Sequence, residues 1–345
     1  MTLKHEVSPV VRMGIDISKN LFQLHGVDKH DKPVLRKGVS RRRFLQELAN
    51  MPACSIGMEA CGSANHWARE LGKLGHSVLL MPAQHVKPYV QNNKNDARDA
   101  EAICEAMSRP RMRFVAVKSI EQHDIQGLHR VRQGLIKSRT ALSNQIRGLL
   151  AEYGIVVSKG ASRIRRALPE ILEDGDNQLT SMSRQLVSEM YEHLCYLDKR
   201  FGLIDTRIKD FVKTSEHCTN LCTAGGIGPM IASSLYAAAG NGSQFRNGRD
   251  MAAWLGLVPR QHSTAGRQVN LSISKRGNRY IRTLLVHGAR SLVLQCHKKE
   301  DSLSRWIQKL TIRVGQNRAC VAVANKLARM AWAILRSKQP CKTFT

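Results

Sequence analysis

The stretch Val10–Ser18, VVRMGIDIS, decides the first part of the fold. It is an apolar run of strand length that contains a single acid, Asp16. Two more strand-like segments, LFQLHGVD at 21–28 and PVLRKGV at 33–39, follow at short spacing, with charged and turn residues between them. Short apolar segments joined by turn residues are typical of an antiparallel meander. We therefore expect three consecutive strands that pair antiparallel.

Helical and strand patterns alternate after this meander. Ser40 can cap a helix that runs to about Ala49, and a short apolar strand, CSIGMEA, covers residues 54–60. A helix near 65–74, a strand at 76–82 and a helix from Asn95 to about Met107 complete the pattern. Strands followed by alternating helices and strands indicate a mixed α/β domain. We place this domain at residues 8–112.

The middle of the chain has helical periodicity. Apolar residues recur at helical spacing over 119–153 and again over 178–213. Two long amphipathic helices around the segment GASRIRRALPEILEDGDN suggest a helical hairpin. We expect residues 113–215 to form a coiled-coil-like arm used for oligomerisation. The alternative is a plain helical layer on the first domain.

Residues 216–340 change composition again, and we expect an all-α C-terminal domain there. This part opens with Gly225, Gly226 and Gly228 before a helix of small residues. Such glycines resemble a helix-hairpin-helix turn, in which backbone N–H groups approach a phosphate oxygen. A glycine-rich tight turn between two packed helices explains the same pattern. A polar loop, RQHSTAGRQVN, and two further apolar segments follow.

The chain is strongly basic. It contains 54 Lys and Arg against 27 Asp and Glu, which gives a formal charge of +27. A polyanion relieves such self-repulsion, and nucleic acid is the first candidate because released phosphate counterions drive its binding. An anionic membrane is the alternative partner. No apolar run approaches the length of about 18 residues that a membrane span needs, so we expect nothing that spans a bilayer.

Nine cysteines are scattered between Cys54 and Cys341. Only Cys218 and Cys222 lie close together, with His217 beside them, and this cluster lacks the second half of a zinc site. We therefore expect free, mostly buried thiols in a reducing cytosol.

Four carboxylates form a candidate metal site. Asp16 lies inside the first strand and Glu59 lies near the end of another. An acid among apolar residues is costly to bury unless it is paired or binds a metal. Asp96 and Asp99 are three residues apart at the start of a helix, so they share nearly the same helix face.

The face that holds Asp96 and Asp99 continues into Ile103, so we expect it to point toward the core. Four acids that converge from two strands and a helix repel one another, and Mg²⁺ resolves this because it prefers oxygen ligands. This layout resembles the RNase H or RuvC nuclease fold. The simpler interpretation keeps the helix acids as partners of the helix dipole and Asp16 as a solvent-facing residue or a partner of Lys19.

Six motifs occur together and in order: GIDISK, MEACG, KNDARDA, GGIGP, WLGLVPRQHSTAGR and ISKRGNRYIR. Over nearly the whole chain they resemble the insertion-sequence transposases with an N-terminal DEDD domain of RuvC type and a C-terminal transposase domain. Members of that family are bridge-RNA-guided DNA recombinases. The resemblance implies that four acids are catalytic and bind Mg²⁺, namely Asp16, Glu59, Asp96 and Asp99.

The family also uses a serine in the loop after its GLxP motif, which attacks DNA and forms a covalent phosphoserine link. The resemblance places this nucleophile at Ser263, the only serine of the loop, with Thr264 as the alternative register. Cations near a nucleophile can hold a phosphate and stabilise its developing charge. The basic residues around the loop are Arg260, Arg267, Lys275, Arg276, Arg279 and Arg282. His262 is a base, a phosphate contact or simply a surface histidine.

The resemblance further implies a guide RNA that pairs with donor and target DNA, so that base pairing chooses the sequence and the protein grips backbones. A homodimer that assembles to a tetramer, in the bacterial cytoplasm at the nucleoid, fits this activity. Two rival functions remain. One is a Holliday-junction-type nuclease that uses the four acids alone, and the other is a DNA-binding remnant without catalysis.

Overall fold

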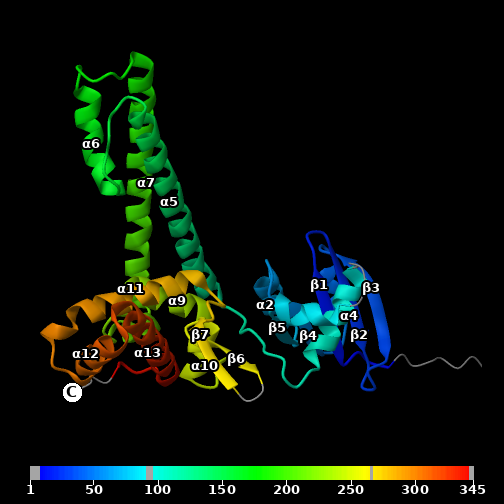
Figure 1. Cartoon of the computed structure of the whole chain (residues 1–345). Coiled ribbons are helices and arrows are strands. Elements are labelled where there is room, and N and C mark those ends of the chain that lie inside the picture. Colours follow the sequence, from blue (N-terminus) through cyan, green and yellow to red (C-terminus); the bar gives the residue numbers. More distant parts are fainter. Residues whose placement is uncertain (1–7, 91–95, 265–266, 342–345) are drawn as a thin grey trace, which may run out of the picture. The chain divides into compact units, whose positions relative to one another are not determined.

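A computed structural model describes residues 8–90, 96–264 and 267–341. The chain divides into two compact units, Met1–Ser119 and Ile120–Thr345. The first unit is a sheet with helices and the second is almost entirely helical (Figure 1).

The first unit contains a mixed five-stranded sheet in the order β3-β2-β1-β4-β5. β1 (Arg12–Ile17), β2 (Leu21–Val27) and β3 (Pro33–Ser40) form the antiparallel meander that the sequence predicts. β4 (Ser55–Glu59) and β5 (Ser77–Met81) then add in parallel, β4 beside β1 and β5 beside β4. The helices are α1 (Phe44–Ala49), α2 (Ala64–Lys73), α3 (Ala83–Val86) and α4 (Asp96–Met107), with a 3₁₀ turn at Lys87–Tyr89. The predicted mixed α/β domain of RuvC type is thus confirmed.

The two faces of this sheet bury different helices. Side chains alternate along a strand, so Met13 and Ile15 of β1 pack on one face with α1 and α2, where Phe22, Phe44 and Trp67 meet edge to face. The opposite face receives α4, which buries Ile103 and Met107 beside Met81. This second face is the one that positions the candidate site.

One predicted helix start is wrong. Ser40 is the last residue of β3, where it pairs with Leu21, and its backbone oxygen accepts from the Arg43 N–H at 3.0 Å. Because Ser40 belongs to the ladder, α1 begins only at Phe44, and Arg43 at its N-cap makes no side-chain capping bond. For α4 the predicted first residue, Asn95, lies outside the described residues, and the helix is described from Asp96.

The second unit begins with the predicted helical hairpin. α5 (Ile120–Ala151) and α7 (Ser181–Thr214) run side by side, and α6 (Ala161–Glu173) packs against both (Figure 1). Phe201 of α7 lies between the guanidinium groups of Arg132 and Arg139, which also pair with Asp205 and Asp198 at 2.6 and 2.9 Å. These stacked ion pairs set the register of the two helices.

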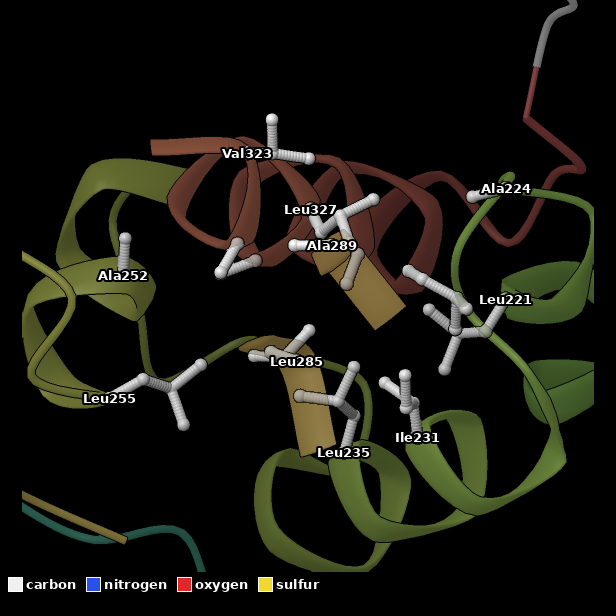
Figure 2. Close-up of a cluster of buried hydrophobic side chains, with 14 of the residues drawn as sticks. Leu221, Ala224, Ile231, Leu235, Ala252, Leu255, Leu285, Ala289, Val323 and Leu327 are labelled. Atoms are coloured by element: carbon white, nitrogen blue, oxygen red, sulfur yellow. The ribbon is translucent and has the colours of Figure 1, made fainter. Parts of the chain in front are cut away.

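The rest of the second unit is a helical bundle. Its helices are α8 (Glu216–Cys222), α9 (Pro229–Ala239), α10 (Gly248–Trp254), α11 (Arg279–Gln295), α12 (Ser302–Val314) and α13 (Gln316–Ser337), with a 3₁₀ turn at Cys296–Lys298. Leu235, Leu255, Leu285 and Leu327 are among the buried side chains of its core (Figure 2). The segment predicted as a polar loop is instead a two-stranded ribbon, β6 (Pro259–Thr264) and β7 (Arg267–Ile273).

Among the described residues, no helix is long and apolar enough to cross a membrane.

Candidate active site

Three of the four predicted acids come together in the structure. Oxygen atoms of Asp16, Asp96 and Asp99 all lie within 4.8 Å of one another. Asp16 projects from near the end of β1, and the two other aspartates occupy the first turn of α4. The sequence separates Asp16 from Asp96 by 80 positions, so the contact of α4 with the sheet is what creates the cluster.

The fourth predicted acid, Glu59, interacts with the aspartates through its charge. It is the last residue of β4, the strand parallel to β1, so both acids lie at the carboxyl ends of neighbouring strands. Partial burial raises the pKa of Glu59, and the charges of Asp16 and Asp99 raise it further. Glu59 is therefore near enough to Asp16 and Asp99 for their charges to act on it, although the group of oxygens within 4.8 Å contains the three aspartates alone.

Two glycines explain why α4 can lie so close to the sheet. Gly14 and Gly57 are register partners on β1 and β4, and each stands two residues before its acid, in Gly14-Ile15-Asp16 and Gly57-Met58-Glu59. Residues two apart share a strand face, so glycine and acid face α4 together. A Cβ added to Gly14 would lie 2.1 Å from the Ala100 backbone oxygen of α4. The Gly-x-acid pattern therefore places the acids beside the helix.

The burial of the helix acids differs from the prediction. Asp99 is half-buried, as expected for the edge of the core-facing side, but Asp96, the first residue of α4, is exposed. Arg98 and Glu101 of the same helix are exposed. The cluster is thus open to solvent on the Asp96 side, where a substrate can approach.

These donors fit a divalent cation. Three carboxylates offer only hard oxygen ligands, which suit Mg²⁺, Mn²⁺ or Ca²⁺ rather than zinc. Burial is the first cause of the raised pKa of Glu59, and the nearby charges of Asp16 and Asp99 add to it, so a cation beside these acids would be favourable. Among the described residues this is the one group of histidines, cysteines and acids with metal-ligand spacing, and all nine cysteines are free thiols, as predicted.

The predicted nucleophile lies in the second unit, on the β6–β7 ribbon. Every residue of β6 is exposed, including Ser263, Thr264 and His262. Ser263 pairs with Gln268 near the end of the ribbon, one residue before Thr264. Ser263 is therefore on the solvent-exposed surface of the second unit.

The predicted basic residues lie on the two strands of the ribbon, in the turn after β7 and at the start of α11. Arg260 lies on β6, where its Nη2 donates to Ser272 Oγ at 3.4 Å, and the Arg267 backbone pairs with Thr264. Lys275, Arg276 and Arg279 are exposed in the turn after β7 and on the first turn of α11. Arg282 differs from them, because its Nη1 donates to the backbone oxygens of Leu255 and Arg276 at 3.0 and 3.2 Å.

The glycine turn before α9 is packed at Gly226 and exposed at Gly228. Gly226 packs closely on α11, where an added Cβ would lie 2.7 Å from Leu292 Cδ1 and 3.2 Å from the Gly288 oxygen. Gly228 is exposed at the N-cap of α9 with open space around it. Helix packing therefore explains Gly226, and Gly228 is the glycine at which a phosphate could approach.

A buried Ser–His pair elsewhere has no access to substrate. His129 of α5 lies 3.0 Å from both Ser233 Oγ and the Tyr280 hydroxyl, which joins α5 to α9 and α11. Burial lowers the pKa of His129 to about 4. Since Ser233 has no exposed surface, these groups hold the helices together rather than act on a ligand. Sequence reasoning did not find this network, because its members are far apart in the chain.

Comparison with known proteins agrees with the geometry. A profile described as "Transposase", of a DEDD domain, matches residues 13–155, and the profile "Transposase IS116/IS110/IS902 family" matches residues 218–304. A probable family 20 transposase of Pseudomonas aeruginosa is 47% identical over 96% of this chain and 98% of its own. The transposase for insertion sequence element IS1111A of Coxiella burnetii is 44% identical over 95% and 90%. The transposase for IS1328 of Yersinia enterocolitica is 38% identical over 94% and 96%.

Transposases act on DNA, and a DEDD domain suggests the use of a divalent metal, in agreement with the acidic cluster. The chain belongs to the IS116/IS110/IS902 family of insertion-sequence transposases.

Proposed function

We propose that this transposase cuts and rejoins DNA with two chemical groups, the Mg²⁺-binding acids of the first unit and Ser263 of the second. The observation that carries the proposal is the convergence of Asp16, Asp96 and Asp99, with Glu59 near enough for the charges of Asp16 and Asp99 to act on it. Acids at this density are costly unless a cation and a phosphodiester use them.

The serine step is a transesterification. The Ser263 oxygen forms a bond to a backbone phosphorus of the DNA, and one P–O bond to the neighbouring nucleoside breaks. The proton lost by the serine hydroxyl balances the one gained by the departing DNA oxygen. Attack of a DNA hydroxyl on the phosphoserine link then restores the serine and joins a new strand, so no external energy source is needed.

The acids and the basic residues have different tasks in this step. A bound Mg²⁺ would stabilise the charge on the phosphate oxygens. The first-unit acids orient that site, and the exposed Lys275, Arg276 and Arg279 lie where they can hold the DNA backbone near the ribbon. Ser263 is preferred over Thr264 because the β-branched threonine is more hindered.

Oligomerisation is proposed along the outer side of the hairpin. Met182, Leu186, Tyr196 and Leu203 are exposed apolar residues on α7. Tyr196 and Leu203 are seven residues apart and Met182 lies fourteen residues before Tyr196, with Glu189 at the heptad position between them. A stripe of this period is typical of helices that pack on another helix. A dimer that assembles to a tetramer would supply enough acid sites and serines for four strands. Tyr196→Asp together with Leu203→Asp should lower the sedimentation coefficient, whereas Glu192→Gln on the same helix should not.

Guidance by a bridge RNA is the third element of the proposal. The net charge of +27 and the low aromatic content of 5% fit a protein that grips phosphate backbones rather than stacks on bases. The test adds a transcript of the noncoding DNA that flanks the gene. Sequence-selective cleavage should require this transcript and should follow changes in its loops.

The chemical proposal is tested by cleavage of element-end DNA on a denaturing gel. Asp99→Asn and Ser263→Ala should each abolish activity, and wild type should leave a protein–DNA adduct. Glu101→Gln, an exposed acid of the same helix, is the matched control and should stay active. Cleavage that survives Ser263→Ala would indicate a nuclease that uses the acids alone. DNA binding without any cleavage, insensitive to chelators, would indicate a non-catalytic remnant.

A further inference from the structure

The ribbon that contains Ser263 has little support along its length. All of β6 is exposed, and Val269 and Leu271 of β7 are 42% and 46% exposed, so the ribbon adds little to the core. A two-stranded ribbon alone is marginally stable in water. Its direction must therefore be fixed where it leaves the helical bundle.

The base of the ribbon is tightly built. Ser274 N–H donates to the Val258 oxygen at 2.8 Å and Lys275 N–H donates to the Gly256 oxygen at 3.2 Å. Gly256 and Gly277 both have positive φ, 72° and 84°. A Cβ on Gly277 would lie only 1.9 Å from the Trp254 oxygen, so the incoming and outgoing chains cross in direct contact.

Two side chains lock this crossing to the bundle. The Arg282 guanidinium on α11 joins the incoming chain at the Leu255 oxygen to the outgoing chain at the Arg276 oxygen. Asn325 Nδ2 on α13 donates to the Leu257 oxygen at 3.1 Å. Both residues are half-buried, and Leu255 and Leu257 are in the core.

We propose that Arg282 and Asn325 are positioning residues that aim the Ser263 hydroxyl, and that Arg282 is not a phosphate contact. This inference rests on the proposed serine chemistry. Ser263 lies four residues beyond Pro259, which at about 3.4 Å per residue is about 14 Å from the base. A tilt of about 10° there moves the hydroxyl by about 2 Å, and a misplacement of about 1 Å can lower a rate about 100-fold.

The two roles of Arg282 give different signatures. A lost phosphate contact weakens DNA binding and lowers the slope of log affinity against log salt by about 0.9. Loss of the hydrogen bonds that hold the base of the ribbon, which we call the brace, leaves the DNA affinity and the salt slope unchanged. It slows formation of the protein–DNA adduct by about 10- to 100-fold. Asn325→Ala is the cleanest variant, because it removes a hydrogen-bond donor without changing charge. Arg279→Gln is the matched control, since Arg279 is exposed on the same helix.

The experiment uses the full chain with the flanking-DNA transcript and an element-end duplex. It measures adduct rate, salt dependence of binding, melting temperature and deuterium uptake of residues 255–278. We expect Arg282→Gln and Asn325→Ala to increase deuterium uptake and to slow adduct formation without changing the salt dependence of DNA binding. Arg279→Gln should instead lower the slope of that salt dependence.

Two results would overturn the inference. A lower salt slope for Arg282→Gln, with wild-type uptake, would make Arg282 a phosphate contact. Increased uptake with a wild-type adduct rate in both variants would show that the brace does not aim the serine. The absence of any adduct from wild type would instead refute the serine chemistry, whatever the uptake shows, so the two failures are distinguishable.

Discussion

Replacement of Gly14 by alanine tests how the acid site is built. The new Cβ would lie 2.1 Å from the Ala100 oxygen, 2.5 Å from the Cys104 nitrogen and 2.9 Å from the Cys104 Cβ. Two of these atoms are helix backbone, which cannot rotate away. Ordinary contact begins at 3.4 Å, so α4 must move outward by about 1.3 Å or the strand must bend.

Both stability and activity should suffer from this movement. Overpacking of a rigid contact costs about 1–3 kcal/mol, which corresponds to a decrease in Tm of roughly 10 °C for a unit of this size. Asp96 and Asp99 move with α4 while Asp16 stays on β1, and Mg²⁺ requires ligands at about 2.1 Å in a near-octahedral set. Metal-dependent cleavage should therefore fall more than stability alone explains.

Two other glycines provide the control series. Gly57→Ala would meet Met107 Sδ at 2.8 Å and otherwise side-chain atoms of Met81 and Ile103, which can adjust, so its effect should be smaller. Gly62→Ala, in the loop after β4, meets nothing within 4 Å and should be neutral. Thermal melting and cleavage of element-end DNA should rank Gly14 above Gly57 above Gly62. A Gly14→Ala protein as stable and active as Gly62→Ala would refute the close-contact argument.

Three further changes test other parts of the structure. Burial and the neighbouring aspartates raise the pKa of the Glu59 carboxyl group, so its charged form is unfavourable in the folded protein. Glu59→Gln removes that charge and should therefore raise the Tm measured in EDTA at pH 7, while it abolishes metal-dependent cleavage. His129 takes up no proton in the fold until about pH 4, while the unfolded chain does near pH 6.5. Stability to urea should therefore fall as pH drops through this window, and His129→Asn should flatten the dependence. Gly256→Ala forces a Cβ to 2.1 Å from a backbone oxygen at φ of 72° and should cost more than about 2 kcal/mol, whereas exposed Gly228→Ala should stay within about 0.5 kcal/mol in melting experiments.

The acid site could be predicted in most of its parts from sequence. Asp16 and Glu59 could be identified because an acid in an apolar strand is costly to bury unless it is paired or binds a metal. The ends of both strands were predicted within about two residues. The exposure of Asp96 was not predictable, since it depends on how α4 packs on the sheet. The Gly14 and Gly57 contacts were missed, although the repeated Gly-x-acid spacing was visible.

The structure around Ser263 could be predicted less well from the sequence. The segment around Ser263 is polar and glycine-containing, which indicates a loop, and its ribbon depends on pairing with residues further along the chain. Arg282 appeared to be one of six equivalent cations because charge alone does not show which guanidinium faces backbone oxygens. Tertiary contacts with α11 and α13, invisible in local sequence, separate the brace from its exposed neighbours.

Packing of α4 on the sheet brings the acids together, and the like charges of the carboxylates oppose that arrangement. Gly14 and Gly57 let α4 pack closely on the sheet, and both burial and the charges of Asp16 and Asp99 raise the pKa of Glu59. The carboxylates are therefore preorganised, and a cation would relieve existing repulsion rather than draw the acids together. A ligand that binds only the folded state stabilises it by mass action. Added Mg²⁺ should thus raise the Tm of wild type with little structural change, and this gain should vanish in Gly14→Ala, where α4 no longer holds its acids at the required distance.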